Sequence, residues 1–511
     1  MSSIICPECD QEINRYYWCK TCNSKHFQND FNNWTSGNDK IDKFIHDAQL
    51  NANYWWNVIE WISYDRFKDV KQVGRGGFGT IHYARWIDER IHKWDIENQQ
   101  WERYRNFEVA LKKFDNFVNI NDVLNEMEIH LKTNKEYYHA SIRFYGITQD
   151  PETHSYMMVL EYAKDGNLRE YLKINFNNIN WEQKLYKLYS LSIILKNIHE
   201  LDIVHQDFHP GNILSSNFKL SSLIKISDFG LSKLMGANPN NPEKKNIFGV
   251  LPYIAPEVLS GDEEYTKAAD VYSFGVIAYE IVTGLPPYPD IPHDKDLAIK
   301  ICNGLRPKIP FHTPKSITKK IMRCWDARVA YRPTFKELNN ELWKYYDDYC
   351  NDKDSEIRIQ IENSEKISKN LRLKNSTITP LNYQTHPQAI YTSRLLNYSK
   401  LPKPKNEENF ERELEELTKS TSALSIIASK LHKTIIPEKK SKIKTIPGIS
   451  KYFYWEWPIE APLAGYIQAK ALPNIGSWIQ FSLAIISNLC NDSIEQPQPM
   501  VSKHMKAFQN G

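Results

Sequence analysis

A glycine-rich segment in the first third of the chain has the composition needed to close over a triphosphate. It reads Gly74-Arg75-Gly76-Gly77-Phe78-Gly79-Thr80-Ile81. Glycines suit this task because a Cβ would keep the backbone away from the phosphates. Glycine-rich turns also join strands for purely structural reasons, so the segment alone decides little. Strand-like runs at 67–70 and 81–84 flank it, which favours a hairpin over a dinucleotide-binding fold, where a helix should follow at once.

A lysine follows on a further strand-like run, Val109-Ala110-Leu111-Lys112. A cation at this point could hold the α- and β-phosphates of a nucleotide. The V-A-x-K register places that role on Lys112 and not on its neighbour Lys113. A carboxylate must then fix the lysine, and the next helical pattern offers Glu126 and Glu128. Helix geometry alone does not choose between these two glutamates.

Two aspartates and an asparagine lie further along the chain at spacings suited to metal-assisted phosphoryl transfer. The first segment reads His205-Gln206-Asp207-Phe208-His209-Pro210-Gly211-Asn212. Asp207 could orient and deprotonate an acceptor hydroxyl, and Asn212, five residues on, could reach round to a metal ion. Asp228 opens Asp228-Phe229-Gly230 behind an apolar run, and its carboxylate could chelate magnesium ions that bridge the phosphates.

These segments, in this order and spacing, resemble those of the eukaryotic protein kinase superfamily over residues 66–346. Three later segments extend the resemblance: Ala255-Pro256-Glu257, the run 270–275 and Tyr331-Arg332-Pro333. It implies an α+β, two-lobed protein kinase fold, with an antiparallel N-lobe sheet plus one helix and a mainly helical C-lobe. It also implies that Glu257 pairs with Arg332 and that the helix at 270–275 anchors the catalytic loop. The implied reaction transfers the γ-phosphate of ATP to a protein hydroxyl.

The resemblance further implies a set of site residues and selects Glu126 as the partner of the lysine. The catalytic residues are Asp207, Lys112, Glu126 and Asn212. The nucleotide-contacting residues are Gly74, Arg75, Gly76, Gly77, Phe78, Gly79, Ile81, Ala110, Lys112, Glu161, Ala163, Leu214 and Asp228. Asn212 and Asp228 would hold Mg²⁺. The run 160–163 looks like the hinge whose backbone binds adenine.

Departures from the kinase pattern concern regulation. Gln206 replaces the arginine that normally pairs with an activation-loop phosphate. The segment from Leu231 to Ile254 contains no threonine, and its only hydroxyl side chains are those of Ser232 and Tyr253. We therefore expect a kinase whose loop is not switched by phosphorylation.

Other departures concern the acceptor. His209 stands where serine/threonine kinases usually carry lysine, and Val250 where they usually carry threonine, so the choice between serine/threonine and tyrosine stays open. The D-V-Y-S-F-G and H-P-G-N forms resemble the tyrosine-kinase-like group, including expanded fungal families, which favours serine/threonine. Two rival functions are a pseudokinase that binds nucleotide or partners without transfer, and a zinc-ribbon adaptor. The presence of Lys112, Asp207, Asn212 and Asp228 favours catalysis.

Two C-x-x-C pairs near the N-terminus predict a metal site at residues 1–30. Their four thiolates, Cys6, Cys9, Cys19 and Cys22, suit a structural zinc ion, with iron as an alternative. No second set of four ligands accompanies them. This zinc-ribbon-like unit, followed by an aromatic-rich helical connector at 31–65, is expected to stabilise the protein or dock another protein. Nucleic-acid binding is not expected, because no basic patch is present.

Several stretches outside the kinase-like region carry weaker signals. We expect Trp86–Phe107 to form an extended, solvent-exposed hairpin loop. Residues 351–450 are polar and are expected to be mostly a disordered linker, except for an amphipathic helix near 407–432. The apolar seam of this helix could dock on its own kinase domain or on a partner; it comprises Phe410, Leu414, Leu417, Thr421, Leu424, Ala428 and Leu431. The segment 451–511 has no assignment.

The composition of the 511-residue chain excludes some functions. Its net charge of +3, with 41% hydrophobic and 25% charged residues, gives neither a nucleic-acid nor a membrane footprint. No signal peptide is visible at the N-terminus. The apolar stretch Trp478–Cys490 is shorter than a membrane span and favours a buried or interfacial helix. The lysine cluster at 439–444 favours a solvated linker over a nuclear-localisation signal. We therefore expect a cytoplasmic location, with the nucleus not excluded.

Overall fold

The computed structural model describes residues 4–14, 16–76, 79–88, 90–103, 107–114, 120–134, 140–220, 223–230, 233–234, 247–374, 385–398 and 400–419. The chain divides into two compact units, residues 1–436 and 437–511. All described residues belong to the first unit. The lysine cluster, the apolar stretch 478–490 and the segment 451–511 lie outside the described residues.

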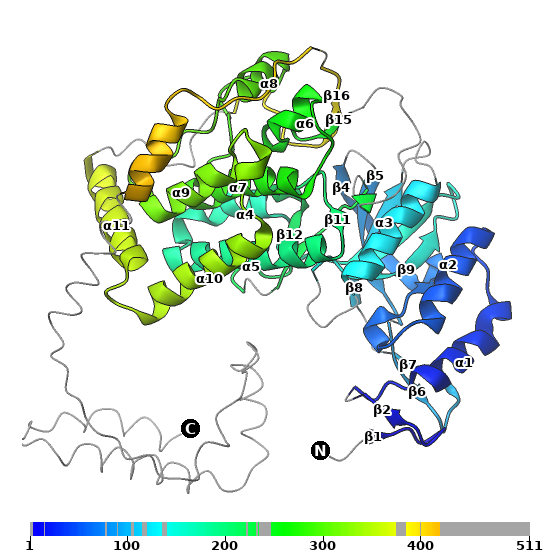
Figure 1. Ribbon diagram of the computed structural model, residues 1–511. Helices are drawn as coiled ribbons and strands as arrows, with labels where there is room; N and C mark the ends of the chain where they lie inside the picture. Colours follow the sequence, from blue (N-terminus) through cyan, green and yellow to red (C-terminus); the bar gives the residue numbers. More distant parts are fainter. Residues whose placement is uncertain are drawn as a thin grey trace, which may run out of the picture. The chain divides into compact units, whose positions relative to one another are not determined.

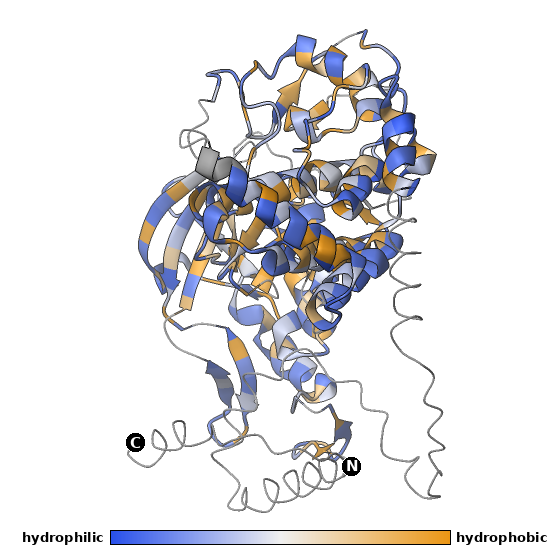
Figure 2. Cartoon of the chain, turned by 90° about the vertical axis from the view of Figure 1, so that its left-hand side faces the viewer, coloured by the Kyte–Doolittle hydropathy of each residue, from blue (hydrophilic) through white to orange (hydrophobic). Residues whose placement is uncertain are grey.

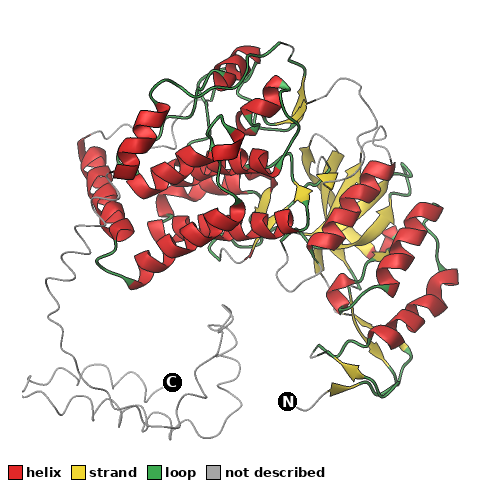
Figure 3. Cartoon of the chain, in the orientation of Figure 1, coloured by secondary structure: helices red, strands yellow, loops and turns green. Residues whose placement is uncertain are grey.

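A six-stranded sheet forms the N-lobe (Figures 1 and 3). Its strands, in spatial order, are β3 (Glu60–Trp61), β9 (Phe144–Gln149), β10 (Tyr156–Glu161), β8 (Phe107–Phe114), β5 (Gly79–Trp86) and β4 (Phe67–Gly76). Only β3 and β9 pair in parallel. Because successive side chains of a strand alternate between faces, Val109 and Leu111 are buried on one side of β8. Ala110 and Lys112 lie on the opposite face, where α3 (Ile120–Thr133) packs.

The C-lobe is mainly helical. Its helices are α4 (Leu168–Asn175), α5 (Trp181–Glu200), α6 (Pro256–Ser260), α7 (Lys267–Thr283), α8 (Lys295–Cys302), α9 (Lys315–Cys324), α10 (Phe335–Asn351) and α11 (Glu356–Lys374). Every residue of α7 from Ala269 to Thr283 is buried, so this helix is the centre of the lobe. Helices at its surface carry both hydrophobic and hydrophilic residues (Figure 2).

Short strand pairs hold the catalytic loop at the top of the C-lobe. Strand β11 (Ile203–Val204) pairs with β14 (Lys233–Leu234), and β12 (Ile213–Ser215) pairs with β13 (Ile224–Ile226). The loop between β11 and β12 carries Asp207 and Asn212. Its two ends are thus fixed by separate ladders, which limits where these side chains can lie.

The cysteine-bearing N-terminal region packs on the N-lobe through the connector helix and an inserted hairpin. It contains β1 (Ile4–Ile5), β2 (Glu12–Ile13), α1 (Lys20–Asp30) and α2 (Asp39–Leu50). Ile41 and Ile45 of α2 share an apolar cluster with α3. The insertion between β5 and β8 forms a hairpin, β6 (Ile91–Asp95) with β7 (Gln100–Arg103).

The expected extended hairpin is present and residues 96–100 at its tip are exposed, but its base is packed, which was not expected. Ile91 is buried, and Trp101 stacks on Phe27 of α1 with ring centroids 4.4 Å apart. Trp94 stacks on His26 at 3.9 Å. The charged residues of the insertion outnumber its aromatic residues, so its sequence did not predict this packing. The aromatic rings form the surface with which the hairpin packs against the cysteine-bearing N-terminal region.

Part of the polar stretch 351–450 is ordered, contrary to expectation. Helix α11 packs on the C-lobe through Ile357 and Ile361, which are buried. We call residues 385–419 the tail; it contains β16 (Arg394–Leu396) and is helical over 410–419. Phe410 is buried in the C-lobe core and Leu414 and Leu417 pack against it, so this part of the seam docks on its own kinase domain. Among the described helices, none combines the length and the apolar character needed to cross a membrane.

Candidate active site

Lys112 of β8 is the centre of a buried charge cluster on the nucleotide side of the site. Its Nζ lies 2.6 Å from Oε1 of Glu126 on α3 and 2.8 Å from Oδ1 of Asp228. Lys112 and Glu126 are 5% and 1% exposed, so solvent does not screen their attraction. The other candidate, Glu128, pairs instead with Lys132 on the surface of the helix. The structure therefore brings together the lysine and the glutamate that the kinase pattern selected.

Burial and charge act against each other in this cluster. Burial disfavours the charge on Lys112, but Asp228 and Glu126 outweigh it and hold the lysine pKa above its ordinary value. Burial raises the pKa of Glu126 in spite of the nearby ammonium. Two carboxylates thus share one ammonium in a water-poor site. An arrangement with excess negative charge is suited to take up a further cation together with phosphates.

The glycine-rich turn between β4 and β5 is only partly described, because Gly77 and Phe78 lie outside the described residues. Gly79 has φ +149°, and a Cβ there would lie 2.0 Å from the carbonyl oxygen of Lys113. Only glycine fits this close approach of two backbones. The turn is therefore held next to the strand that carries Lys112. Gly74, Arg75, Gly76 and Ile81 lie on the two paired strands of the same hairpin.

The predicted adenine contacts gather at one place. Ala110, Ala163 and Leu214 join the same apolar cluster, together with buried Leu160. They come from three separate elements, β8, the segment after β10, and β12. Glu161 ends β10. An apolar surface between two lobes with backbone groups at its edge is the usual environment for a nucleobase.

Asp228 and Phe229 lie between the Lys112 cluster and the loop that carries Asp207. Asp228 has φ +63°, an unusual conformation that turns its carboxylate toward Lys112. Phe229 is fully buried, with its ring 5.1 Å from His130 and 5.0 Å from His205. Burial lowers the pKa of His130 to about 3, so this ring stays neutral beside the lysine. Sequence reasoning missed His130, since a lone histidine in a helix carries no signal.

The loop between β11 and β12 holds Asp207 through contacts with its own residues and with the tail. The side-chain amide of Asn212 donates to the Asp207 carbonyl oxygen at 2.9 Å. The ring of His209 accepts at Nδ1 from the Gly211 amide at 3.0 Å, and its Nε2 lies 3.5 Å from Oδ1 of Asp207. Burial would raise the pKa of Asp207, but His209 and a hydrogen bond from Ser393 outweigh it and hold the pKa below its usual range. The carboxylate is therefore kept in the form that can accept a proton.

Two buried carboxylates make the contacts that the resemblance implied. The carboxylate of Asp270 on α7 accepts from the amides of His205 at 2.9 Å and Gln206 at 3.2 Å. The guanidinium of Arg332 donates two hydrogen bonds of 2.7 Å to Glu257. Both predicted contacts are confirmed. The Asp270 contacts fix the backbone next to Asp207, so the position of Asp207 does not depend on its own side-chain contacts alone.

The hydroxyl of Tyr253, in the activation segment, is not available to solvent. Tyr253 is 2% exposed, and its hydroxyl lies 2.5 Å from Oε2 of Glu280 and 2.7 Å from the Arg169 guanidinium. The other hydroxyl of that segment, Ser232, lies outside the described residues. Tyr253 therefore has a structural contact network in place of the exposure that a modification site needs.

Ser393 is the residue that sequence reasoning missed entirely. It belongs to the tail, and its hydroxyl donates to Oδ2 of Asp207 at 2.5 Å. The two residues are 186 positions apart in the sequence. Serines are frequent in the polar stretch 351–450, and none of the motifs points to this one.

The four N-terminal cysteines converge at one point. Their sulfur atoms all lie within 4.8 Å of one another, with Cys6 and Cys22 at 3.8 Å and Cys9 and Cys19 at 3.6 Å. A tetrahedral site with Zn–S bonds of about 2.3 Å puts its sulfurs about 3.8 Å apart. The arrangement of these thiols is therefore compatible with a four-coordinate metal ion.

Comparisons with known proteins match the kinase-like region. The family model for protein tyrosine and serine/threonine kinases matches residues 67–342, more than half of the chain. A protein of Acanthamoeba polyphaga mimivirus, described as a serine/threonine-protein kinase/receptor, is 30% identical over 308 residues, 60% of this chain and 17% of that protein. A tyrosine-protein kinase of Girardia tigrina is 29% identical over 291 residues, 55% of this chain and 53% of that protein. A probable serine/threonine-protein kinase of Dictyostelium discoideum is 28% identical over 293 residues, 55% of this chain and 8% of that protein. The matched region thus spans about half or less of these curated relatives.

Proposed function

The chain belongs to the protein tyrosine and serine/threonine kinase family, and on that premise we propose that it transfers the γ-phosphate of ATP to hydroxyl groups of proteins. One observation carries the proposal of catalysis. The lysine, the glutamate and the metal-type aspartate that the chemistry needs are assembled in one cluster, with Lys112 bonded to Glu126 and Asp228. A pseudokinase usually lacks one of these groups.

The residues of this chain divide the work of phosphoryl transfer. Lys112 would hold the α- and β-phosphates, and Asp207 would orient the acceptor hydroxyl and take its proton. Asn212 and Asp228 would hold Mg²⁺, which neutralises charge on the phosphates when it is bound. Their oxygen atoms suit that ion, and the amide nitrogen of Asn212 is already engaged by the Asp207 carbonyl, which leaves its side-chain oxygen to face the metal.

The acceptor class is proposed as serine or threonine before tyrosine. His209 is held by the Gly211 amide beside Asp207, and can donate a hydrogen bond at the place where a lysine usually contacts the γ-phosphate. Membership of the tyrosine-kinase-like group stays a prediction, and so does a cytoplasmic location.

We also propose that loop phosphorylation does not switch this kinase. Gln206 has no guanidinium to pair with a phosphate. The buried contacts of Tyr253 with Glu280 and Arg169 argue against modification of that hydroxyl.

Incorporation of labelled phosphate from ATP into an added protein, or into the chain itself, tests catalysis. The control is Asp207→Asn, which keeps the size of the side chain and removes the base. Incorporation that disappears in the control is the expected result. Incorporation that is no greater than in the control would favour the pseudokinase alternative and overturn the proposal.

The cysteine cluster is proposed to hold a structural zinc ion, because four sulfur ligands leave no open position for substrate. Metal analysis of the purified full chain should find about one equivalent of zinc. Less than half an equivalent, with no iron in its place, would refute the site. The stacking of Trp94 on His26 places the unit against the kinase N-lobe, which favours a stabilising role over an independent adaptor. An adaptor would lose partner binding in Cys9→Ser and keep full phosphotransfer.

A further inference from the structure

The tail adds a strand to the activation segment. Strand β15 (Ile247–Gly249) pairs antiparallel with β16, in the register Ile247 with Leu396, Phe248 with Leu395 and Gly249 with Arg394. Figures 1 and 3 show the two strands side by side at the end of the C-lobe that faces the N-lobe. An extended segment that adds a strand to an exposed edge is a general mode of peptide recognition. Here the peptide is part of the same chain.

Contacts on the N-terminal side of Ser393 anchor the tail to the C-lobe. The ring of His293 bonds to the carbonyl oxygen of Ile390 at 2.9 Å. The Tyr391 hydroxyl donates to the Pro287 carbonyl oxygen at 2.8 Å, and its ring covers the Arg169 guanidinium at 4.5 Å. The approach to Ser393 is therefore fixed by backbone and side-chain contacts together.

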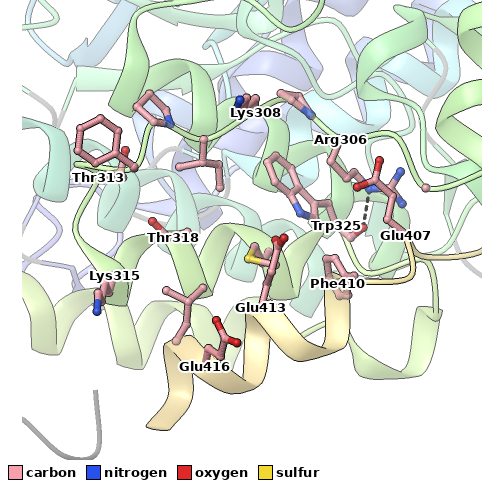
Figure 4. A pocket seen from close by; sticks show the side chains of 17 residues that line it. Arg306, Lys308, Thr313, Lys315, Thr318, Trp325, Glu407, Phe410, Glu413 and Glu416 are labelled. Atoms are coloured by element: carbon pink, nitrogen blue, oxygen red, sulfur yellow. Dashed lines mark hydrogen bonds between the residues drawn. The ribbon is translucent and has the colours of Figure 1, made fainter. Parts of the chain in front are cut away.

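Contacts on the C-terminal side are equally specific. Leu396 is 3% exposed within the C-lobe core. The Asn406 amide donates to Asp326 and its oxygen accepts from the Ala327 amide, both at 2.8 Å. The helix at 410–419 then covers a cavity of about 680 Å³ that both Phe410 and Trp325 line (Figure 4). Ser393 lies between two anchored flanks, so its position is imposed by the fold.

The hydrogen bonds of Ser393 place its hydroxyl as a phosphate acceptor. Nδ1 of His209 accepts from the Gly211 amide, so the ring proton is on Nε2, which donates to Oγ of Ser393 at 3.1 Å. The serine proton is then directed at Oδ2 of Asp207, 2.5 Å away. This leaves one lone pair of Oγ for attack on phosphorus. At Gly249 a Cβ would lie 3.3 Å from Oδ1 of Asp207, so a glycine keeps this corner open.

We propose that Ser393 is an intramolecular phosphorylation site of this chain, modified by its own active site. The inference rests on the proposed kinase activity and names a substrate for it. Oγ of Ser393 forms a bond to the γ-phosphorus of ATP, while the bond between that phosphorus and the β,γ-bridging oxygen breaks. The hydroxyl proton passes to Asp207, and ADP leaves with the electron pair of the broken bond.

The same placement makes the tail a competitor of other substrates. A segment tethered in the same chain has an effective concentration on the order of millimolar, which exceeds that of most cellular proteins. The product carries a charge of about −1.5 to −2 beside the Asp207 carboxylate. Repulsion between the two groups opposes the β15–β16 pairing, so modification releases the tail and opens the acceptor site.

Phosphosite mapping by mass spectrometry, on the full chain with ATP and Mg²⁺, tests the proposal. The expected result is phosphate on Ser393 that is lost in Asp207→Asn. Thr392 is the matched control, because it is exposed and adjacent to Ser393, and the described hydrogen bonds to the Asp207 carboxylate come from Ser393 and Asn212. Thr392→Ala should keep the phosphate on Ser393, and Ser393→Thr should accept it on the new hydroxyl.

An isotope experiment tests the intramolecular route. Wild-type chain is mixed with an Asp207→Asn chain that is labelled with heavy isotopes and still carries Ser393. Phosphate on the light chain alone is expected, whereas equal phosphate on both chains would overturn a transfer within one molecule.

Two results separate the failure of this inference from that of the proposed function. Asp207-dependent phosphate on other residues or on an added protein, with Ser393 bare, would overturn the inference and leave the kinase activity intact. No Asp207-dependent phosphate on any protein would overturn both.

Discussion

The nucleotide side and the acceptor side of the active site are built in different ways. On the nucleotide side, Lys112 and Glu126 are buried and bonded to each other, and Lys112 also bonds to the partly exposed Asp228. On the acceptor side, Asp207 is held by its own loop through Asn212 but bonds to Ser393, which arrives from the far end of the domain. In the first cluster every partner is a charged residue of the site itself. In the second, the partner of Asp207 is the Ser393 hydroxyl, which another hydroxyl or water could replace.

The difference has a physical meaning. A buried ammonium and carboxylate cannot separate without leaving an uncompensated charge, so the nucleotide side must stay assembled. A serine hydroxyl can be exchanged for water or for another hydroxyl at little cost. The nucleotide side of the site therefore stays assembled, whereas the hydroxyl bound to Asp207 on the acceptor side can be exchanged. Four substitutions, given in order of decreasing effect, test this comparison.

The largest effect is expected for Asp207→Asn. Removal of a general base lowers the rate of phosphotransfer by roughly 10²–10⁴-fold. Nucleotide affinity should stay close to that of the wild type, because Asp207 belongs to the acceptor side. Initial rates of phosphate transfer and nucleotide titration measure the two quantities. A parallel loss of both would contradict the division into two halves.

Lys112→Met should disrupt the nucleotide side. It leaves Glu126 buried without its partner, and breaking a buried pair in this way costs about 3–5 kcal/mol of unfolding free energy. Lys113→Met is the matched control, because Lys113 is bonded to Asp150 where both side chains keep some exposure, 22% and 15%. Loss of this pair should cost less than loss of the fully buried pair, because water can reach the carboxylate that is left behind. Chemical denaturation of both variants checks the prediction, which fails if the two neighbours cost the same.

Leu396→Asp should detach the tail without disturbing the nucleotide side. Burial of a leucine side chain contributes about 1.5–3 kcal/mol, and an aspartate at this position would also be buried without a partner. The control is Leu395→Asp, because Leu395 is 45% exposed. Hydrogen exchange of β15 and β16 amides should accelerate in the Leu396 variant alone. Unchanged protection of β15 would show that the tail is not held at this point.

Ser393→Ala has the smallest expected effect, about 1 kcal/mol, because water can replace the lost hydrogen bond. The folded-state pKa of Asp207 lies below its usual range, so its carboxylate contributes stability that is present above an unfolded pKa of about 3.9 and is lost as pH falls through the folded value. Removal of the serine raises that folded value. The acid loss of stability should therefore be smaller than in the wild type and should be complete at a higher pH, because it begins at the same unfolded pKa in both proteins. Superimposable unfolding midpoints between pH 2 and 7 would refute a contact of Ser393 with the aspartate.

Much of the fold and of the nucleotide side could be predicted from local sequence. Four short motifs carried this prediction: the glycine spacing, the V-A-L-K strand, and the H-Q-D and D-F-G segments. Each motif spans only a few residues and indicates a backbone conformation or a charge that the chemistry needs. Helix geometry left Glu126 and Glu128 equivalent, the kinase resemblance selected Glu126, and the packing of α3 against β8 shows the physical reason, a buried partner against a surface one. The packing of the hairpin at Ile91–Arg103 was missed because its charges outnumber its two packed tryptophans.

The sequence by itself predicted residues suited to bind a triphosphate, a metal ion and an acceptor hydroxyl. It could do so because each motif is short and its chemistry depends on neighbouring residues. The cysteine spacing likewise indicated a four-sulfur site before the sulfurs were seen to converge. Only the tertiary structure decided what occupies the acceptor side. Ser393 reaches Asp207 through strand pairing, the burial of Leu396 and the docking of the tail helix. Such contacts depend on surfaces that exist only after the C-lobe has folded, and no spacing along the chain encodes them.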